Sequence, residues 1–132
     1  LGDVYKRQDH SVKLEEFTDN RYDAIIGLDP NGINTGVFFL RNTVWSRLFL
    51  AEAWTLTQEE NTYKWWEQAS IMRLVKAEGV RNHVKISPQT HFNSYVTNSL
   101  DDSFIIHFPG SDKKEVWRYI LKYYGLRKNL LA

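Results

Sequence analysis

The stretch that decides the fold runs from a polar segment into an apolar strand and then into a helix. It reads Ile33-Asn34-Thr35-Gly36-Val37-Phe38-Phe39-Leu40-Arg41-Asn42 and continues through Trp45-Ser46 to Phe49-Leu50. The apolar run at residues 37–40, bounded by Gly36 and Arg41, is typical of a strand covered on both faces. We therefore expect a central strand of a sheet, preceded at residues 33–36 by a polar turn where a ligand could bind.

The rest of the chain alternates between apolar strands and amphipathic helices. Strands are expected at residues 23–28, 84–86 and 104–108, and helices at residues 14–17, 44–54, 63–77 and 114–124. Thr43 and Asp112 can cap two of these helices, and Gly79 and Gly125 can end two of them. Trp45, Leu48, Phe49 and Ala53 share one helix face, which should pack inward. The alternation predicts an α/β layered domain with a partly parallel sheet.

Composition limits the class of protein. The 132 residues suffice for one modest core but fall below the usual size of a complete sugar-nucleotide enzyme, so we expect a fragment. The 17 basic and 16 acidic residues are interspersed, with a net charge of +1, which argues against a nucleic-acid partner. There is no cysteine, no apolar run of membrane-spanning length and no signal-peptide core.

The first eight residues, Leu1-Gly2-Asp3-Val4-Tyr5-Lys6-Arg7-Gln8, look like translated sequencing-adapter read-through. We expect residues 1–8 to be non-native and leave them out of the fold prediction. Residues 9–132 would then form the C-terminal part of a single domain.

A second polar segment follows the last apolar strand. It reads His107-Phe108-Pro109-Gly110, with Lys113 and Lys114 close behind. A histidine at the carboxyl end of a strand lies where open α/β sheets generally bind ligands, although a structural, hydrogen-bonded histidine is the alternative.

These segments together resemble the galactosyl and mannosyl transferases of glycosyltransferase family 34. The similarity spans about residues 9–120, and its motifs follow the order of the family: Asn34-Thr35-Gly36-Val37-Phe38, Arg41-Asn42, Trp45-Ser46, Glu67-Gln68, Pro88 with Phe92-Asn93-Ser94-Tyr95, and His107-Phe108 with Gly110. The resemblance implies a GT-A fold, a three-layer, Rossmann-like mixed sheet flanked by helices, with its N-terminal part missing here.

The same resemblance implies a retaining transferase that moves galactose, mannose or xylose from a nucleotide-diphosphate sugar to a glycan hydroxyl. It implies a Mn²⁺ or Mg²⁺ cofactor, with His107 as one metal ligand and an Asp-x-Asp motif upstream of residues 10–15. It also implies a single-pass membrane parent in the Golgi or another endomembrane lumen. Without the Asp-x-Asp motif, we expect this fragment to be inactive.

The resemblance also assigns roles to other residues. Gln68 would stabilise the oxocarbenium-like centre and Glu67 would bind a sugar or acceptor hydroxyl, while Trp66 stands where many relatives have a carboxylate. Asn34, Thr35, Gly36 and Asn93 would border the donor or acceptor, and Gly110 with Lys113 or Lys114 would meet the diphosphate. As alternatives, Glu67 and both lysines are solvated, and residues 92–95 form a turn with core aromatics.

Other functions remain open. A non-catalytic carbohydrate-binding module would use Trp65 and Trp66 as exposed stacking platforms, and a degenerate transferase would bind without catalysis. A metal-dependent hydrolase is disfavoured, since the sequence has no histidine-rich or multi-carboxylate ligand cluster.

Overall fold

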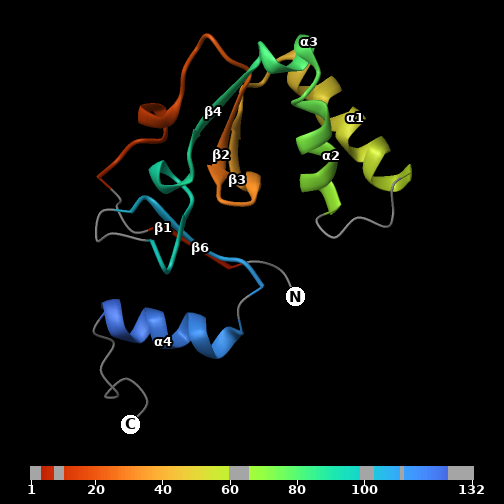
Figure 1. Ribbon diagram of the computed structural model, residues 1–132. Coiled ribbons are helices and arrows are strands. Elements are labelled where there is room, and N and C mark those ends of the chain that lie inside the picture. The colour runs from red at the N-terminus through yellow and green to blue at the C-terminus, as the bar shows by residue number, and fades with distance from the viewer. Residues whose placement is uncertain (1–3, 8–10, 60–65, 99–102, 111, 125–132) are drawn as a thin grey trace.

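The computed structural model describes residues 4–7, 11–59, 66–98, 103–110 and 112–124 (Figure 1). Its strands are β1 (Val4–Arg7), β2 (Ala24–Asp29), β3 (Gly32–Leu40), β4 (Val84–Pro88), β5 (Ser94–Tyr95) and β6 (Ile105–Phe108). Its helices are α1 (Val44–Glu59), α2 (Trp66–Leu74), α3 (Glu78–Arg81) and α4 (Lys113–Tyr124), with 3-10 turns η1 (Leu14–Phe17) and η2 (Gln89–His91). The chain is a mixed α/β structure.

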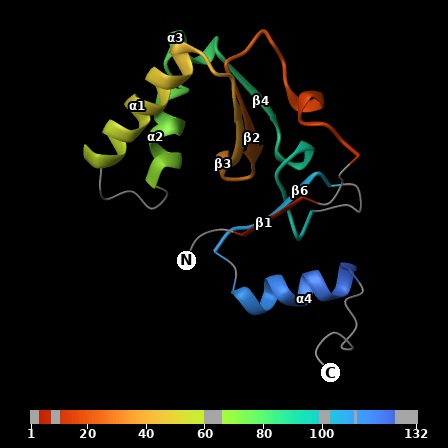
Figure 2. The same cartoon turned by 180° about the vertical axis from the view of Figure 1, so that it is seen from behind.

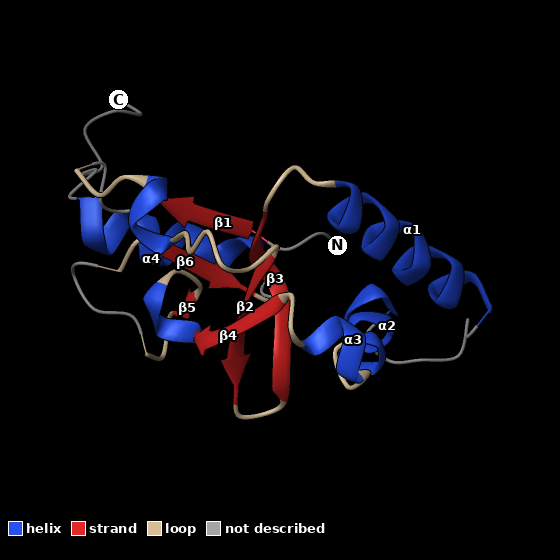
Figure 3. Ribbon diagram, turned by 90° about the horizontal axis from the view of Figure 1, so that it is seen from above, coloured by secondary structure: helices blue, strands red, loops and turns tan. Residues whose placement is uncertain are grey.

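One sheet has the order β3-β2-β4 (Figure 3). Strand β2 pairs antiparallel with β3 and parallel with β4, so the prediction of a partly parallel sheet is confirmed. The expected central position of residues 37–40 is wrong, because β2 lies between its two partners and β3 lies at the edge of the described sheet. Residues alternate between the faces of a strand, and both Ile25 and Ile26 are buried, so β2 is the strand covered on both faces.

Helices α1 and α2 cover one face of this sheet, as Figures 1 and 2 show from opposite sides. The core between helices and sheet consists of Ala24, Ile26, Phe49, Ala53, Ile71, Val75 and Val84. Thr43 caps α1 as predicted, since its Oγ1 accepts a hydrogen bond from the backbone N–H of Ser46 at 3.2 Å. Leu48 was expected inside but is 65% exposed, because it falls outside the face that meets the sheet.

A second sheet, ordered β1-β6-β5, lies beside the first and carries α4 on its far side (Figure 1). Val116 and Tyr119 of α4 pack against Ile106 and Phe108 of β6. Strand β1 pairs antiparallel with β6, so part of the segment set aside at residues 1–8 occupies a place in the sheet. Whether residues 1–8 are native stays a prediction.

Helix boundaries differ from the expected ones at several points. Helix α1 continues to Glu59, beyond its expected end at residue 54. The long second helix is replaced by α2 and the short α3, and Gly79 lies inside α3 instead of ending a helix. Residues 60–65 and Gly125 lie outside the described residues. Within the described part of the chain, no helix is long and apolar enough to cross a membrane.

The predicted polar turn at residues 33–36 is instead a bulge within β3. Asn34 pairs with Gly27 and Phe38 pairs with the adjacent Ile26, so Thr35, Gly36 and Val37 have no separate partners on β2. The turn between β2 and β3 comes earlier, at Pro30 and Asn31, where the sequence Asp29-Pro30-Asn31-Gly32 predicts a turn. A bulge re-aims the side chains around it, and this one brings the polar residues of β3 toward the second sheet.

Candidate functional site

Asn34 lies at the centre of a buried cluster of polar side chains. Its Nδ2 donates to Asp29 Oδ2 at 3.0 Å and to the Tyr95 hydroxyl at 2.6 Å. Its Oδ1 accepts from the backbone N–H of Gly36 at 2.9 Å and from Asn93 Nδ2 at 2.8 Å. The Gly36 N–H can only donate, so the oxygen of the Asn34 amide must face it. These four bonds use both amide hydrogens and both oxygen lone pairs of Asn34.

Asp29 joins this cluster to the β2–β3 turn. Its Oδ2 also accepts from the Tyr95 hydroxyl at 2.6 Å, and its Oδ1 accepts from the backbone N–H of Asn31 at 2.7 Å. Gly32 follows with a φ of 116°, a backbone conformation that glycine adopts readily. One carboxyl group therefore holds both the turn and the Asn34 amide.

His107 packs directly on the bulge. It is only 2% exposed, and its ring lies 5.6 Å from that of Tyr95, centroid to centroid. A Cβ atom on Gly36 would stand 2.6 Å from His107 Nδ1 and 3.0 Å from Asn34 Oδ1, so position 36 has no room for a side chain. The glycine allows the backbone of β3 to touch the imidazole.

Gln68 reaches the same bulge from α2. Its Oε1 accepts a hydrogen bond from the backbone N–H of Thr35 at 3.2 Å. Thr35 Oγ1 and Asn93 Oδ1 are buried and have no hydrogen-bond partner among the described residues. Such atoms are costly to bury without a partner, so they are the polar atoms of the cluster with capacity for a ligand or a water molecule.

The structure thus brings together six residues selected from the sequence, which come from β3, α2, β6 and the segment after η2. These residues are Asn34, Thr35, Gly36, Gln68, Asn93 and His107. Asp29 and Tyr95 also belong to the cluster, although the sequence predicts only a turn at Asp29 and places Tyr95 only within a family motif. The sequence around Asp29 signals only the turn Asp29-Pro30-Asn31-Gly32 and gives no other indication that Asp29 belongs to a site.

The other predicted residues lie elsewhere. Glu67 is exposed on α2, and Lys113 and Lys114 are exposed in the first turn of α4. Asp112 caps that helix, as predicted, by accepting from the backbone N–H of Lys114 at 3.1 Å. Gly110 has a φ of 61° and open space around the position of a Cβ. The ligand roles expected for these residues stay predictions.

A model of one protein family, the galactosyl transferase GMA12/MNN10 family, matches residues 5–118. The chain belongs to this family. The match includes the whole cluster around Asn34 and confirms the resemblance seen in the sequence. No curated protein and no solved structure matches the chain. Membership in the GMA12/MNN10 family makes glycosyl transfer the class of activity, with a sugar donor and an acceptor as substrates.

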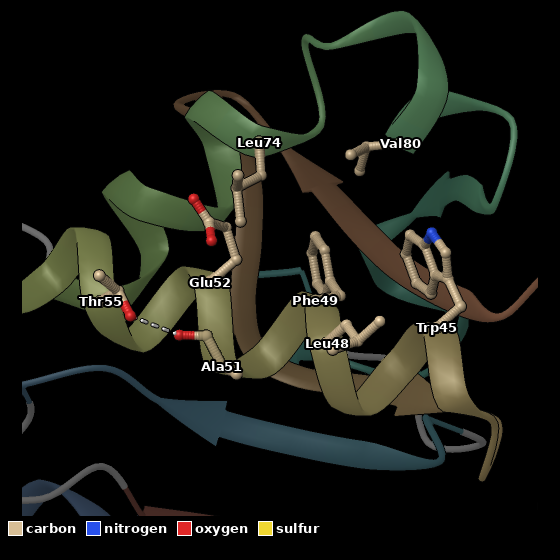
Figure 4. A pocket seen from close by; sticks show the side chains of 8 residues that line it. All are labelled: Trp45, Leu48, Phe49, Ala51, Glu52, Thr55, Leu74 and Val80. Atoms are coloured by element: carbon tan, nitrogen blue, oxygen red, sulfur yellow. Dashed lines mark hydrogen bonds between the residues drawn. The ribbon is translucent and has the colours of Figure 1, made fainter.

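A separate apolar groove of about 350 Å³ lies between α1 and the α2–α3 segment (Figure 4). Its lining consists of Trp45, Leu48, Phe49, Ala51, Glu52, Thr55, Leu74 and Val80. Thr55 donates its hydroxyl hydrogen to the carbonyl of Ala51 at 3.0 Å and so does not face the groove with a free donor. Glu52 is the one charged residue of the lining. A sugar needs several convergent polar groups, so the buried cluster is the better candidate site for this GMA12/MNN10 family member.

Proposed function

We propose that this chain contributes the sugar-binding and leaving-group side of a retaining glycosyltransferase of GT-A fold. The reaction would move galactose, mannose or xylose from a nucleotide-diphosphate sugar to a glycan hydroxyl. One observation carries the proposal: Gln68, Thr35, Gly36 and His107, from three separate elements, meet at the bulge of β3. Family membership supports the glycosyl-transfer class, and the sequence resemblance supports retention and the GT-A fold.

Gln68 suits the role of the group that stabilises positive charge on the sugar. Departure of the nucleotide leaves an oxocarbenium-like centre, which a fixed carbonyl oxygen stabilises electrostatically. The hydrogen bond from Thr35 takes one lone pair of Gln68 Oε1 and holds the oxygen in place. Its second lone pair would face the sugar.

A divalent metal is part of the proposal, and the described residues fit only part of its site. They contain no group of three or more His, Asp or Glu side chains that could hold an ion. His107 would supply an imidazole nitrogen to the ion, and a nitrogen beside oxygen ligands suits Mn²⁺. When bound, such an ion would neutralise the diphosphate leaving group. The carboxylate ligands would come from an Asp-x-Asp motif, which the 132-residue sequence does not contain.

Nuclear magnetic resonance titration of the chain tests the proposal. UDP-galactose, GDP-mannose and UDP-xylose would be added separately, with and without Mg²⁺, because paramagnetic Mn²⁺ would broaden the signals of the site. We expect one of them to shift the amide signals of Thr35 and Gly36 and the ring signals of His107. His107→Gln should weaken that binding, and His91→Gln, an exposed histidine bound to Ser87, should leave it unchanged. Shifts confined to other residues, or none, would contradict the proposal.

The chain as it stands should transfer little or no sugar, because its sequence lacks the Asp-x-Asp motif. Purified chain would be assayed for release of nucleoside diphosphate in the presence of a glycan acceptor and Mn²⁺. Metal-dependent transfer that exceeds the signal of the His107→Gln variant would contradict this expectation.

A carbohydrate-binding module is the second candidate, and exposed tryptophans favour it. Trp66 is 74% exposed, Trp54 is 67% exposed and Trp117 is 59% exposed, whereas Trp65 lies outside the described residues. Flat exposed rings can stack on sugars. Glycan binding without nucleotide, lost in Trp66→Ala and retained in His107→Gln, would favour this module over the transferase.

A further inference from the structure

The Asn34 amide has a structural task that leaves it little capacity for a ligand. Three of its hydrogen bonds join β3 to Asp29, Tyr95 and Asn93, and the fourth accepts from the Gly36 N–H within β3 itself. Asn34 is 5% exposed and Asn93 is fully buried, so these bonds form out of water, where leaving one unmade is costly. Asn34 therefore holds the bulge of β3 in its conformation, provided that its own side chain is held in one orientation.

We propose that Asp29 is the positioning residue of this site. Its Oδ2 receives both the Asn34 amide and the Tyr95 hydroxyl, so it sets the rotation of the Asn34 side chain. A rotated Asn34 would turn a donor toward the Gly36 N–H, which is itself a donor, and the bond at 2.9 Å would be lost. Asp29 thereby holds the backbone of Gly36 against His107.

Tyr95 gives the arrangement its second anchor. Its hydroxyl bonds both Asp29 and Asn34, and its ring lies beside that of His107 at 5.6 Å. Strand β5 pairs Tyr95 with His107 in register. One residue thus joins the carboxyl group that orients the bulge to the histidine that the bulge touches.

This role of Asp29 in the site rests on the proposed function. The hydrogen bond from the Gly36 N–H to Asn34 can nevertheless be measured without any reaction. Amide hydrogen exchange of the 132-residue chain reports the Gly36 N–H directly. The amide of Ala24, buried in β2 and bonded to the His83 carbonyl at 3.0 Å, serves as the reference for global opening. The variants are Asp29→Ala, Asp29→Asn and Tyr95→Phe, and the matched control is Asp19→Ala, whose carboxyl group binds Arg21 and Lys85 instead.

We expect Asp29→Ala to speed exchange at Gly36 at least tenfold relative to Ala24 and to shift the Cε1–H signal of His107. Asp29→Asn keeps an acceptor oxygen and should restore part of the protection. Tyr95→Phe keeps the ring and loses the hydroxyl, so it should give a smaller change in the same direction. If Asp29→Ala does not fold, Tyr95→Phe replaces it as the test variant. Asp19→Ala should leave the ratio of Gly36 to Ala24 exchange unchanged.

Two results would overturn the inference. The first is unchanged protection of Gly36 in Asp29→Ala and Tyr95→Phe. The second is an equal loss at Gly36 and Ala24, which would make Asp29 a contributor to global stability only. Failure of the proposed function would look different: the wild-type chain would bind no nucleotide sugar, while the Gly36 and His107 signals still followed Asp29.

Discussion

Gly36 and His107 are in direct contact, and the imidazole occupies the space that a side chain at position 36 would need. The contact joins the two sheets, because Gly36 belongs to β3 and His107 to β6. It depends on the bulge that carries Thr35 and Gly36 out of register with β2. Because Gly36 has no side chain, the backbone of β3 can lie against the His107 ring of β6.

Gly36→Ala should destabilise the chain by about 1–3 kcal/mol, the usual cost of overpacking a filled interior. The new Cβ meets a ring held on a strand, which cannot swing aside as the end of a flexible side chain can. Urea unfolding measures the effect. Gly79→Ala is the control: it lies in α3 with nothing within 4 Å, and it should be neutral or stabilising by up to about 1 kcal/mol. Equal stability of the two variants would show that Gly36 and His107 are not in contact.

Phe92→Ala should cost about 3–5 kcal/mol, as expected for removing a large ring from a filled core. Phe92 is 1% exposed and meets Phe39 edge to face at 4.9 Å and Phe17 at 6.2 Å. Thermal unfolding followed by circular dichroism would show the loss. Leu14→Ala, at a side chain that is 52% exposed, should change stability far less. Similar losses in both variants would contradict the position assigned to Phe92.

Thr43→Ala should cost about 1 kcal/mol, because it removes the N-cap of α1. The hydroxyl accepts from the Ser46 N–H and donates to Asp23 Oδ1 at 2.7 Å. Thr43→Ser keeps the oxygen and should restore most of the loss in urea unfolding. Thr55→Ala, inside the same helix, removes only a bond to the preceding turn and should be close to neutral. A cost at Thr55 equal to that at Thr43 would argue against the cap.

The Asp23–His83 pair should make stability fall in acid. The hydrogen bond from His83, with Nδ1 2.6 Å from Asp23 Oδ2, and the bond from Thr43 lower the pKa of Asp23. A carboxyl group whose pKa is lower in the folded state stabilises the fold above its unfolded pKa of about 3.9. That contribution is lost as the pH falls below about 4 and through the folded pKa.

The test compares urea midpoints of the wild type and Asp23→Asn between pH 7 and pH 2. We expect the wild type to be more stable near neutrality and the two curves to converge at the acid end, where Asp23 is protonated in both states. Parallel curves across the whole range would exclude a role of Asp23 in acid unfolding.

Much of the fold could be predicted from residues that act on their neighbours in sequence. Apolar runs predicted β2 and β6, and the alternation of apolar and polar residues at 84–86 predicted β4. Thr43 and Asp112 were recognised as caps because a cap bonds an amide only two or three residues away. The motif order gave the family. The position of residues 37–40 was mistaken because an apolar run predicts burial, whereas strand order depends on which segments pair.

The sequence by itself determined the α/β class, the caps and the family, since hydrophobic periodicity, turn chemistry and motifs are local properties. Only the tertiary structure decided that Asn34 is held by Tyr95, 61 residues away, and that Tyr95 binds Asp29, 66 residues away. It also decided that Gly36 meets His107 across two sheets. Hydrogen bonds and close contacts between distant segments have no sequence period, because they form only when packing has brought those segments together.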